Sequence, residues 1–269
     1  MKSIIFFLLL VFVANFHQCF ATEIQSSLQF QQSDGKAFNN HYVKQNLYSF
    51  NELIYSKQTS FGGSFNVAKI NSPNNNVERY ALFGPEIFHR YKFFSKNNFG
   101  LVVQNAFKLP NVYNPEKNMA LMPNKNQYDY EIRLIQLYNF KDRLIGNVVR
   151  KSTPYFFRTE LAYRQRFHNP FNEIKLNLIG NYALSDSFQV LVQDNINWNV
   201  QTANHKQNHL NNTYKNFEVA KTANNMLNLS LIYNHSTETA YQLGYTKRLS
   251  GNNPFYDSYS VNLGIMKLW

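Results

Sequence analysis

Apolar and polar side chains alternate along residues 173–200. Ile174, Leu176 and Leu178 are separated by polar residues, and the alternation resumes at Phe188 after a tight turn predicted at 184–187. A period of two predicts β-strands with one apolar face and one polar face. Two such strands joined by a short polar turn are typical of a transmembrane β-barrel.

The same period of two recurs along the chain and predicts twelve strands. They are expected at residues 23–32, 45–56, 60–70, 79–94, 98–109, 127–140, 154–167, 172–184, 187–200, 223–234, 238–249 and 257–269. A phase slip within 45–56 predicts a β-bulge there. Because every backbone group in lipid must be paired, only a closed sheet could carry these strands across a bilayer. The predicted fold class is therefore all-β, a single-chain antiparallel transmembrane β-barrel of twelve strands.

The predicted connections are alternately short and long, as periplasmic turns and extracellular loops are in such barrels. The short ones fall at 56–59, 95–98, 184–187 and 235–238, and the long ones at 33–44, 71–79, 110–126, 168–172, 201–222 and 250–257. The segment Lys141–Pro154 departs from this alternation, because it should be short and is not. Residues 143–149 within it could form an extra strand, although an even strand number is the rule for bacterial barrels.

The N-terminus has the pattern of an export signal. Lys2 is followed by the apolar run Ile4–Ala14, which is too short to span a bilayer, and by a small residue at Ala21. We expect residues 1–21 to be a cleaved signal peptide and 22–269 to form the barrel; an uncleaved anchor helix is the alternative. Cys19 is the only cysteine, so the mature chain would contain no disulfide and no thiol nucleophile.

The composition fits a barrel with a polar interior and an apolar exterior. Mean hydropathy is −0.44 although 16% of the residues are aromatic. A soluble core would combine many Phe and Tyr residues with fewer Asn and Gln residues, whereas a membrane barrel accommodates both sets on opposite faces. The formal net charge of +11 is dispersed along an exported chain, which argues against nucleic acid as a partner.

The outward positions predict contact with outer-membrane lipid, with one exception. Asp194 has the outward parity, and a carboxylate at mid-bilayer would cost about 2 kcal/mol or more. We therefore expect either a bulge at Asp194 or a position near the membrane edge. The last strand ends with Ile265, Lys267 and Trp269 on one face, which resembles the C-terminal signal of Gram-negative outer-membrane proteins. That resemblance implies recognition by the barrel-assembly machinery through the strand ending at Trp269.

The inward positions are strongly charged and mostly basic. They comprise Glu86, Arg90, Lys92, Lys108, Asp129, Glu131, Arg133, Arg158, Glu160, Arg164, Arg166, Lys175 and Arg248. We expect Glu131 and Arg133 to lie opposite Arg158 and Glu160. One interpretation is a ladder of ion pairs that fills the barrel, and the other is an electropositive pore that prefers small anionic solutes.

Enzymatic and metal-binding motifs are weak. His235 and Ser236 are adjacent and would point to opposite faces of a strand, so the segment predicts a periplasmic turn and not a nucleophile with its base. His89 has the outward parity. His205 and His209 could bind a metal, but no cysteine or nearby carboxylate supports them. The sequence contains no dinucleotide or phosphate-binding fingerprint, and no cofactor is expected.

Three segments together resemble an uncharacterised family of proteobacterial outer-membrane β-barrels. They are 130–134 with its Glu-x-Arg-Leu pattern, 157–166, and 172–176. The family is similar to porin-like barrels of the phenol-degradation meta-pathway group. Ala162 stands where the family has Gly, and Lys141–Pro154 is longer than its pattern. The resemblance implies a barrel in the bacterial outer membrane and no established activity.

Three functions therefore remain open on the sequence alone. The first is a small-solute pore with a basic lumen. The second is a closed barrel with a structural or surface-interaction role, and the third is a lipid-modifying enzyme, for which the nucleophile and base are missing.

Overall fold

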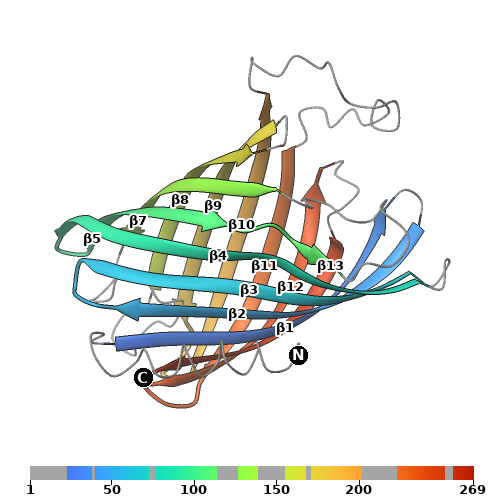
Figure 1. The fold of residues 1–269 in the computed structure, drawn as a ribbon. Coiled ribbons are helices and arrows are strands. Elements are labelled where there is room, and N and C mark those ends of the chain that lie inside the picture. The colour runs from blue at the N-terminus through green and yellow to red at the C-terminus, as the bar shows by residue number, and fades with distance from the viewer. Residues whose placement is uncertain are drawn as a thin grey trace, which may run out of the picture.

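The computed structural model describes residues 23–37, 40–72, 77–113, 127–138, 155–167, 171–201, 223–251 and 257–269. They form one antiparallel sheet (Figure 1). Its strands are β1 Glu23–Ala37, β2 Asn40–Ile54, β3 Thr59–Ser72, β4 Val77–Lys96, β5 Phe99–Lys108, β6 Val112–Tyr113, β7 Tyr128–Tyr138, β8 Tyr155–Phe167, β9 Phe171–Ala183, β10 Phe188–Gln201, β11 Ala223–Asn234, β12 Thr239–Ser250 and β13 Asp257–Leu268.

The sheet closes on itself as a barrel of twelve long strands, which confirms the predicted fold class. β3 pairs with β4 and β1 pairs with β13, so no edge separates the first strands from the last. At the closure, Ile24 and Trp269 exchange backbone hydrogen bonds of 3.3 and 2.8 Å. The thirteenth strand, β6, has two residues and lies beside β4 beyond the end of β5. Each of the twelve long strands therefore has a hydrogen-bonded neighbour on both sides, as a bilayer requires.

The strands extend further than the sequence predicted at one rim of the barrel. β1 continues to Ala37 and β2 begins at Asn40, so most of the loop expected at 33–44 is a hairpin. The loops expected at 71–79 and 168–172 are shortened in the same way. Beyond the membrane both faces of a strand contact water. A strand can therefore continue there without alternating apolar and polar residues, and the sequence pattern does not reveal it.

Some predictions lie outside the described residues. These are the signal peptide at 1–21, the possible extra strand at 143–149, and the histidines His205 and His209. Among the residues that the structure does describe, no helix is long and apolar enough to cross a membrane.

The bulge predicted within 45–56 is absent, and so is the bulge that was one of the two alternatives for Asp194. β2 is in continuous register with β1 and β3, so the phase slip within 45–56 is not a bulge. Instead, Phe88 on β4 stacks on Phe50, with ring centroids 5.4 Å apart. Phe88 is buried, and Phe50 shares the inward parity of the buried residues Asn46 and Glu52 on β2. β10 is also in continuous register, so Asp194 lies in mid-strand without a bulge.

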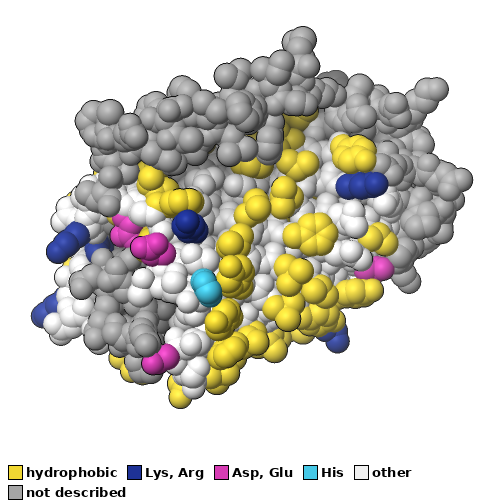
Figure 2. All heavy atoms as spheres, turned by 90° about the horizontal axis from the view of Figure 1, so that it is seen from below, with side chains coloured by type: hydrophobic (Ala, Val, Ile, Leu, Met, Phe, Trp, Pro, Cys, Tyr) yellow, Lys and Arg dark blue, Asp and Glu magenta, His cyan; other side chains and the backbone are white. Residues whose placement is uncertain are grey.

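The outer face of the barrel is apolar, as predicted. Figure 2 shows hydrophobic side chains gathered in a band on one face of the molecule. The leucines Leu161, Leu229 and Leu243 are 52%, 54% and 52% exposed to solvent, whereas their strand neighbours of opposite parity are buried, or half-buried in the case of Gln242. Exposed tyrosines and phenylalanines pack against one another between neighbouring strands, including the tilted pair Phe188–Tyr233 and the stacked pair Tyr245–Tyr259. Such aromatic girdles mark the two membrane interfaces of outer-membrane barrels.

We predict that Gly62→Ala destabilises the barrel while Gly180→Ala does not. A Cβ at Gly62 would lie 2.5 Å from the carbonyl oxygen of Asn51 and 2.4 Å from the Phe88 ring, whereas a Cβ at Gly180 would have no atom within 4 Å. Overpacking of this kind costs about 1–3 kcal/mol. Urea unfolding in lipid vesicles, followed by tryptophan fluorescence, measures both variants. Equal stabilities of the two variants would contradict the close packing of β3 against Phe88.

Candidate functional site: the charged interior

The charged residues predicted on the inward face are gathered in the interior of the barrel. Seven of the thirteen are buried, namely Arg90, Lys92, Asp129, Glu131, Arg158, Glu160 and Arg164. The other six, Glu86, Lys108, Arg133, Arg166, Lys175 and Arg248, are partly exposed. Most of them come from the adjacent strands β4, β5, β7, β8 and β9, and Arg248 is on β12. One wall of the interior therefore carries most of the predicted charge.

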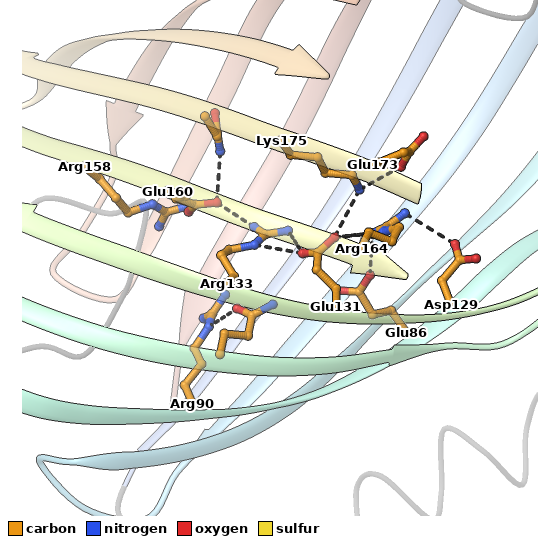
Figure 3. Close-up of polar contacts among 12 residues, drawn as sticks. Glu86, Arg90, Asp129, Glu131, Arg133, Arg158, Glu160, Arg164, Glu173 and Lys175 are labelled. Carbon is orange, nitrogen blue, oxygen red and sulfur yellow. Dashed lines mark hydrogen bonds and ion pairs between the residues drawn. The ribbon is translucent and has the colours of Figure 1, made fainter. Parts of the chain in front are cut away.

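Glu131 on β7 is the centre of this charged wall (Figure 3). Its Oε1 accepts hydrogen bonds from Arg133, with Nε at 2.9 Å. Its Oε2 accepts from Arg164 at 2.8 Å and from Lys175 Nζ at 3.1 Å. Three cations from three strands thus converge on one carboxylate that is 2% exposed. Charge-assisted bonds of this kind are about twice as strong as neutral ones.

Glu160 on β8 extends the same network, because it contacts both Arg133 and Arg158. Its Oε2 accepts from Arg133 Nη1 at 2.5 Å and from Asn177 Nδ2 at 3.2 Å. Its Oε1 forms an ion pair of 2.5 Å with Arg158. Arg133 therefore bridges Glu131 and Glu160, as Figure 3 shows, and ties β7 to β8 within the lumen.

Glu173 at the start of β9 extends the network toward the rim that carries the long loops. It forms ion pairs with Arg166 at 2.6 Å and with Lys175 at 3.7 Å. Arg164 also approaches Glu86 at 3.5 Å and Asp129 at 3.7 Å. These longer contacts add weaker attraction to the same guanidinium group.

A second, smaller cluster lies around Arg90 on β4. Arg90 donates to Glu52 Oε2 and to Gln104 Oε1, each at 2.7 Å. Its guanidinium carbon lies 4.4 Å from the centroid of the Phe88 ring, within reach of a cation–π interaction. Glu52 is fully buried and also accepts a hydrogen bond of 2.5 Å from Ser60. The contacts of Glu52 and Arg90 therefore link β2, β3, β4 and β5.

Sequence reasoning missed Glu52 and Glu173 as inward residues. Glu52 shares the parity of Ile54 and Asn46, which are buried, but the phase slip in its strand concealed that signal. Glu173 lies at the start of a predicted strand, where alternation does not define the direction of a side chain. Its spacing of two from Lys175, which was predicted to face inward, was the available signal. With these two, the carboxylates in this set number six against nine cations.

The predicted pairing of β7 with β8 is wrong by several residues. Glu131 lies opposite Arg164, and Arg133 lies opposite Ala162. Arg158 lies opposite Leu137, at the rim that carries the short turns. The connection between these strands spans 139–154 and is too long to fix their register, so the turn gave no constraint.

The opposite wall of the interior carries amides and hydroxyls. Ser230 Oγ donates to Asn228 Oδ1 at 2.7 Å and accepts from Gln242 Nε2 at 2.9 Å. Gln31 Nε2 donates to Ser260 Oγ at 2.6 Å in a similar pair between β1 and β13. The interior is thus divided into a charged wall and a neutral polar wall. Both are suited to contact water or polar solutes, and neither is suited to contact lipid.

The alternative catalytic motif has the structure of a turn. Ser236 Oγ accepts hydrogen bonds from the backbone N–H groups of Glu238 and Thr239 at 3.2 and 3.0 Å. The His235 ring packs against Tyr233 and Tyr241 on the outer surface. The predicted turn is confirmed, and Ser236 is engaged in shaping it. In the described part of the chain, no group of three His, Cys, Asp or Glu residues is placed to hold a metal ion.

Comparison with known proteins supports the fold without supplying a family. No protein-family model matches the sequence, and no curated protein matches it. An outer-membrane channel from Pseudomonas putida F1 is similar in structure, with a TM-score of 0.63, 10% identity, and coverage of 93% of this chain and 96% of that chain. The NanC porin is similar with a TM-score of 0.53, 8% identity, and coverage of 91% and 98%.

These similarities, together with the apolar outer band and the closed sheet, identify the chain as a barrel of the outer-membrane type. They support the barrel that the resemblance implied. No sequence match supports the proteobacterial family itself.

Proposed function

We propose that the protein is a small-solute channel of the bacterial outer membrane and that its basic interior favours anions. The carrying observation is the balance of the interior charges. Every one of the six carboxylates in the interior set contacts at least one cation, yet cations outnumber carboxylates by nine to six. The excess positive charge would attract anions into the lumen, and the low dielectric constant of the surrounding wall would strengthen that attraction.

Ion pairing limits the strength of the proposed anion preference. Arg158, Arg164 and Arg166, which together dominate the basic character of β8, all contact carboxylates. A passing anion competes with Glu160, Glu131 and Glu173 for these guanidinium groups. We therefore expect a modest selectivity and no tight binding site.

Conductance in planar bilayers tests the proposal. A tenfold KCl gradient across the membrane should give a reversal potential of the sign expected for chloride preference. Lys108→Gln removes one interior cation and should move the reversal potential toward zero. Lys57→Gln is the matched control, because Lys57 lies in an exposed turn. Cation preference of the wild-type channel would contradict the basic lumen.

A closed structural barrel is the second candidate function. The density of ion pairs on the charged wall favours it, because buried arginine–carboxylate pairs fill space that a pore would leave open. Complete absence of current in correctly folded protein would select this function over the channel. We propose a non-enzymatic role in either case, since Ser236 and His235 serve a turn. Recognition of the strand ending at Trp269 by the barrel-assembly machinery is part of the same proposal.

A further inference from the structure

Asp194 on β10 is a charged side chain on the outer wall, where lipid is expected. It shares the outward parity of Val192 and Trp198, which are 43% and 37% exposed. In the continuous register of β10 it lies opposite Leu178 on β9 and Leu227 on β11. A carboxylate there is costly in hydrocarbon unless a donor group meets it.

The described part of the chain supplies no such donor. Asp194 Oδ1 is buried among its neighbours and accepts no hydrogen bond, and the same is true of Asn225 Oδ1 on β11. Asn225 lies opposite Ile196, one outward position above Asp194. Asp194 and Asn225, here called the acceptor patch, therefore each carry an oxygen without a donor on the outward side of the sheet, although these two Oδ1 atoms have almost no accessible surface. Asp194 as a whole is only partly buried and its Oδ2 is not among the buried oxygens without a donor, so Oδ2 is the atom that a donor from outside the barrel would meet.

Another outward pair offers the complementary groups. His89 on β4 is exposed and lies directly opposite Asn105 on β5. Asn105 Oδ1 accepts a hydrogen bond of 2.8 Å from the Tyr130 hydroxyl. That bond engages the amide oxygen and leaves the Nδ2 N–H groups as donors, and the imidazole adds another donor. His89 and Asn105 are here called the donor patch.

The two patches lie at the same depth on nearly opposite sides of the barrel. Asp194 is six residues from the start of β10, and His89 is seven residues from the end of β4; both strand ends lie at the rim with the short turns. At about 3.3 Å per residue and a common strand tilt, their depths agree to about one residue. Five strand pairings separate β10 from β4 around the ring. The patches of one copy therefore cannot meet each other.

We propose that copies of this protein associate side by side in the membrane, with the acceptor patch of one copy against the donor patch of the next. The contact is heterologous, and because the patches lie nearly opposite each other it generates rows in place of small closed rings. Gly180 lies opposite Val192 on the outer wall beside Asp194, and the space over its Cα is empty. A small residue at such a position lets two membrane-embedded walls approach closely.

Disulfide cross-linking in native membranes tests this contact without altering either patch. In a Cys19→Ser background, Val192→Cys and Tyr91→Cys introduce thiols one outward position from Asp194 and from His89. The variant with both thiols should form a ladder of dimers, trimers and larger species upon mild oxidation. Val192→Cys alone and Tyr91→Cys alone should remain monomeric. The control variant Leu161→Cys/Leu243→Cys places exposed thiols on strands outside both patches and should give no ladder.

Removal of the carboxylate gives the decisive comparison. Asp194→Leu added to the Val192→Cys/Tyr91→Cys variant should reduce the cross-linked fraction about tenfold, as loss of one charge-assisted hydrogen bond would. A heat-modifiable shift on SDS gels verifies that each variant is folded. Cross-linking that equals the Leu161/Leu243 control, or that is unchanged by Asp194→Leu, would overturn the proposal. Efficient cross-linking of Val192→Cys alone would indicate a symmetric contact and would also overturn it.

Discussion

Glu131→Gln is expected to cause the largest loss of stability of any single change in the interior, and to increase anion selectivity. Three cations, Arg133, Arg164 and Lys175, converge on this carboxylate, which is almost fully buried. Breaking a buried ion pair by removing one partner costs about 3–5 kcal/mol, because the remaining charges lose their compensation. Urea unfolding in vesicles measures the stability, and the reversal potential in a KCl gradient measures the selectivity.

Glu86→Gln is the matched control for this experiment. It removes the same charge from the same wall, but among the described residues Glu86 makes a single ion-pair contact, at 3.5 Å to Arg164, and it is 19% exposed. We therefore expect Glu86→Gln to shift the reversal potential in the same direction while lowering the free energy of unfolding by about 1 kcal/mol or less. Equal losses of stability in the two variants would show that the convergence of three cations on Glu131 does not contribute specifically to the free energy of unfolding.

Leu161→Arg is expected to destabilise the barrel by about 2–4 kcal/mol in a bilayer, the cost of an arginine on the lipid face near the midplane. Leu161 is 52% exposed on β8 and lies between Leu134 on β7 and Leu176 on β9 in a row of three leucines. A guanidinium in this row has no partner to accept its hydrogen bonds. Unfolding by urea in vesicles measures the change.

Leu184→Arg controls for the charge itself. Leu184 is 60% exposed but lies in the turn between β9 and β10, outside the strands. Its substitution should change the free energy of unfolding by less than about 0.5 kcal/mol, as is usual for surface positions. If Leu161→Arg were as mild as Leu184→Arg, the outer face of β8 would not be in contact with lipid.

The residues of the charged wall were largely predictable, but their partners were not. Parity alone placed Arg133 and Glu160 on one face, because side-chain direction depends only on the local backbone. Parity could not show that Arg133 lies opposite Ala162 and reaches Glu160 diagonally, since strand register is set between strands and the connection at 139–154 does not constrain it.

Local pattern also failed where the interior packs irregularly. Phe50 faces inward because it stacks on Phe88, which lies beneath the Arg90 guanidinium. That arrangement needs Gly62 on the strand between them, which leaves room for the Phe88 ring. The pattern of β2 therefore slips in phase, and alternation alone does not identify Glu52 as the partner of Arg90.

The sequence by itself determined the strands, the parity of each strand and hence the membrane-spanning barrel, because a period of two is a property of the local chain. Only the tertiary structure decided the closure of β1 on β13, the register of β7 on β8, and the convergence of three cations on Glu131. It also showed that Asp194 remains in mid-strand on the outer wall, where no donor among the described residues meets its Oδ1. These features depend on contacts between residues far apart in the chain, which no local alternation encodes.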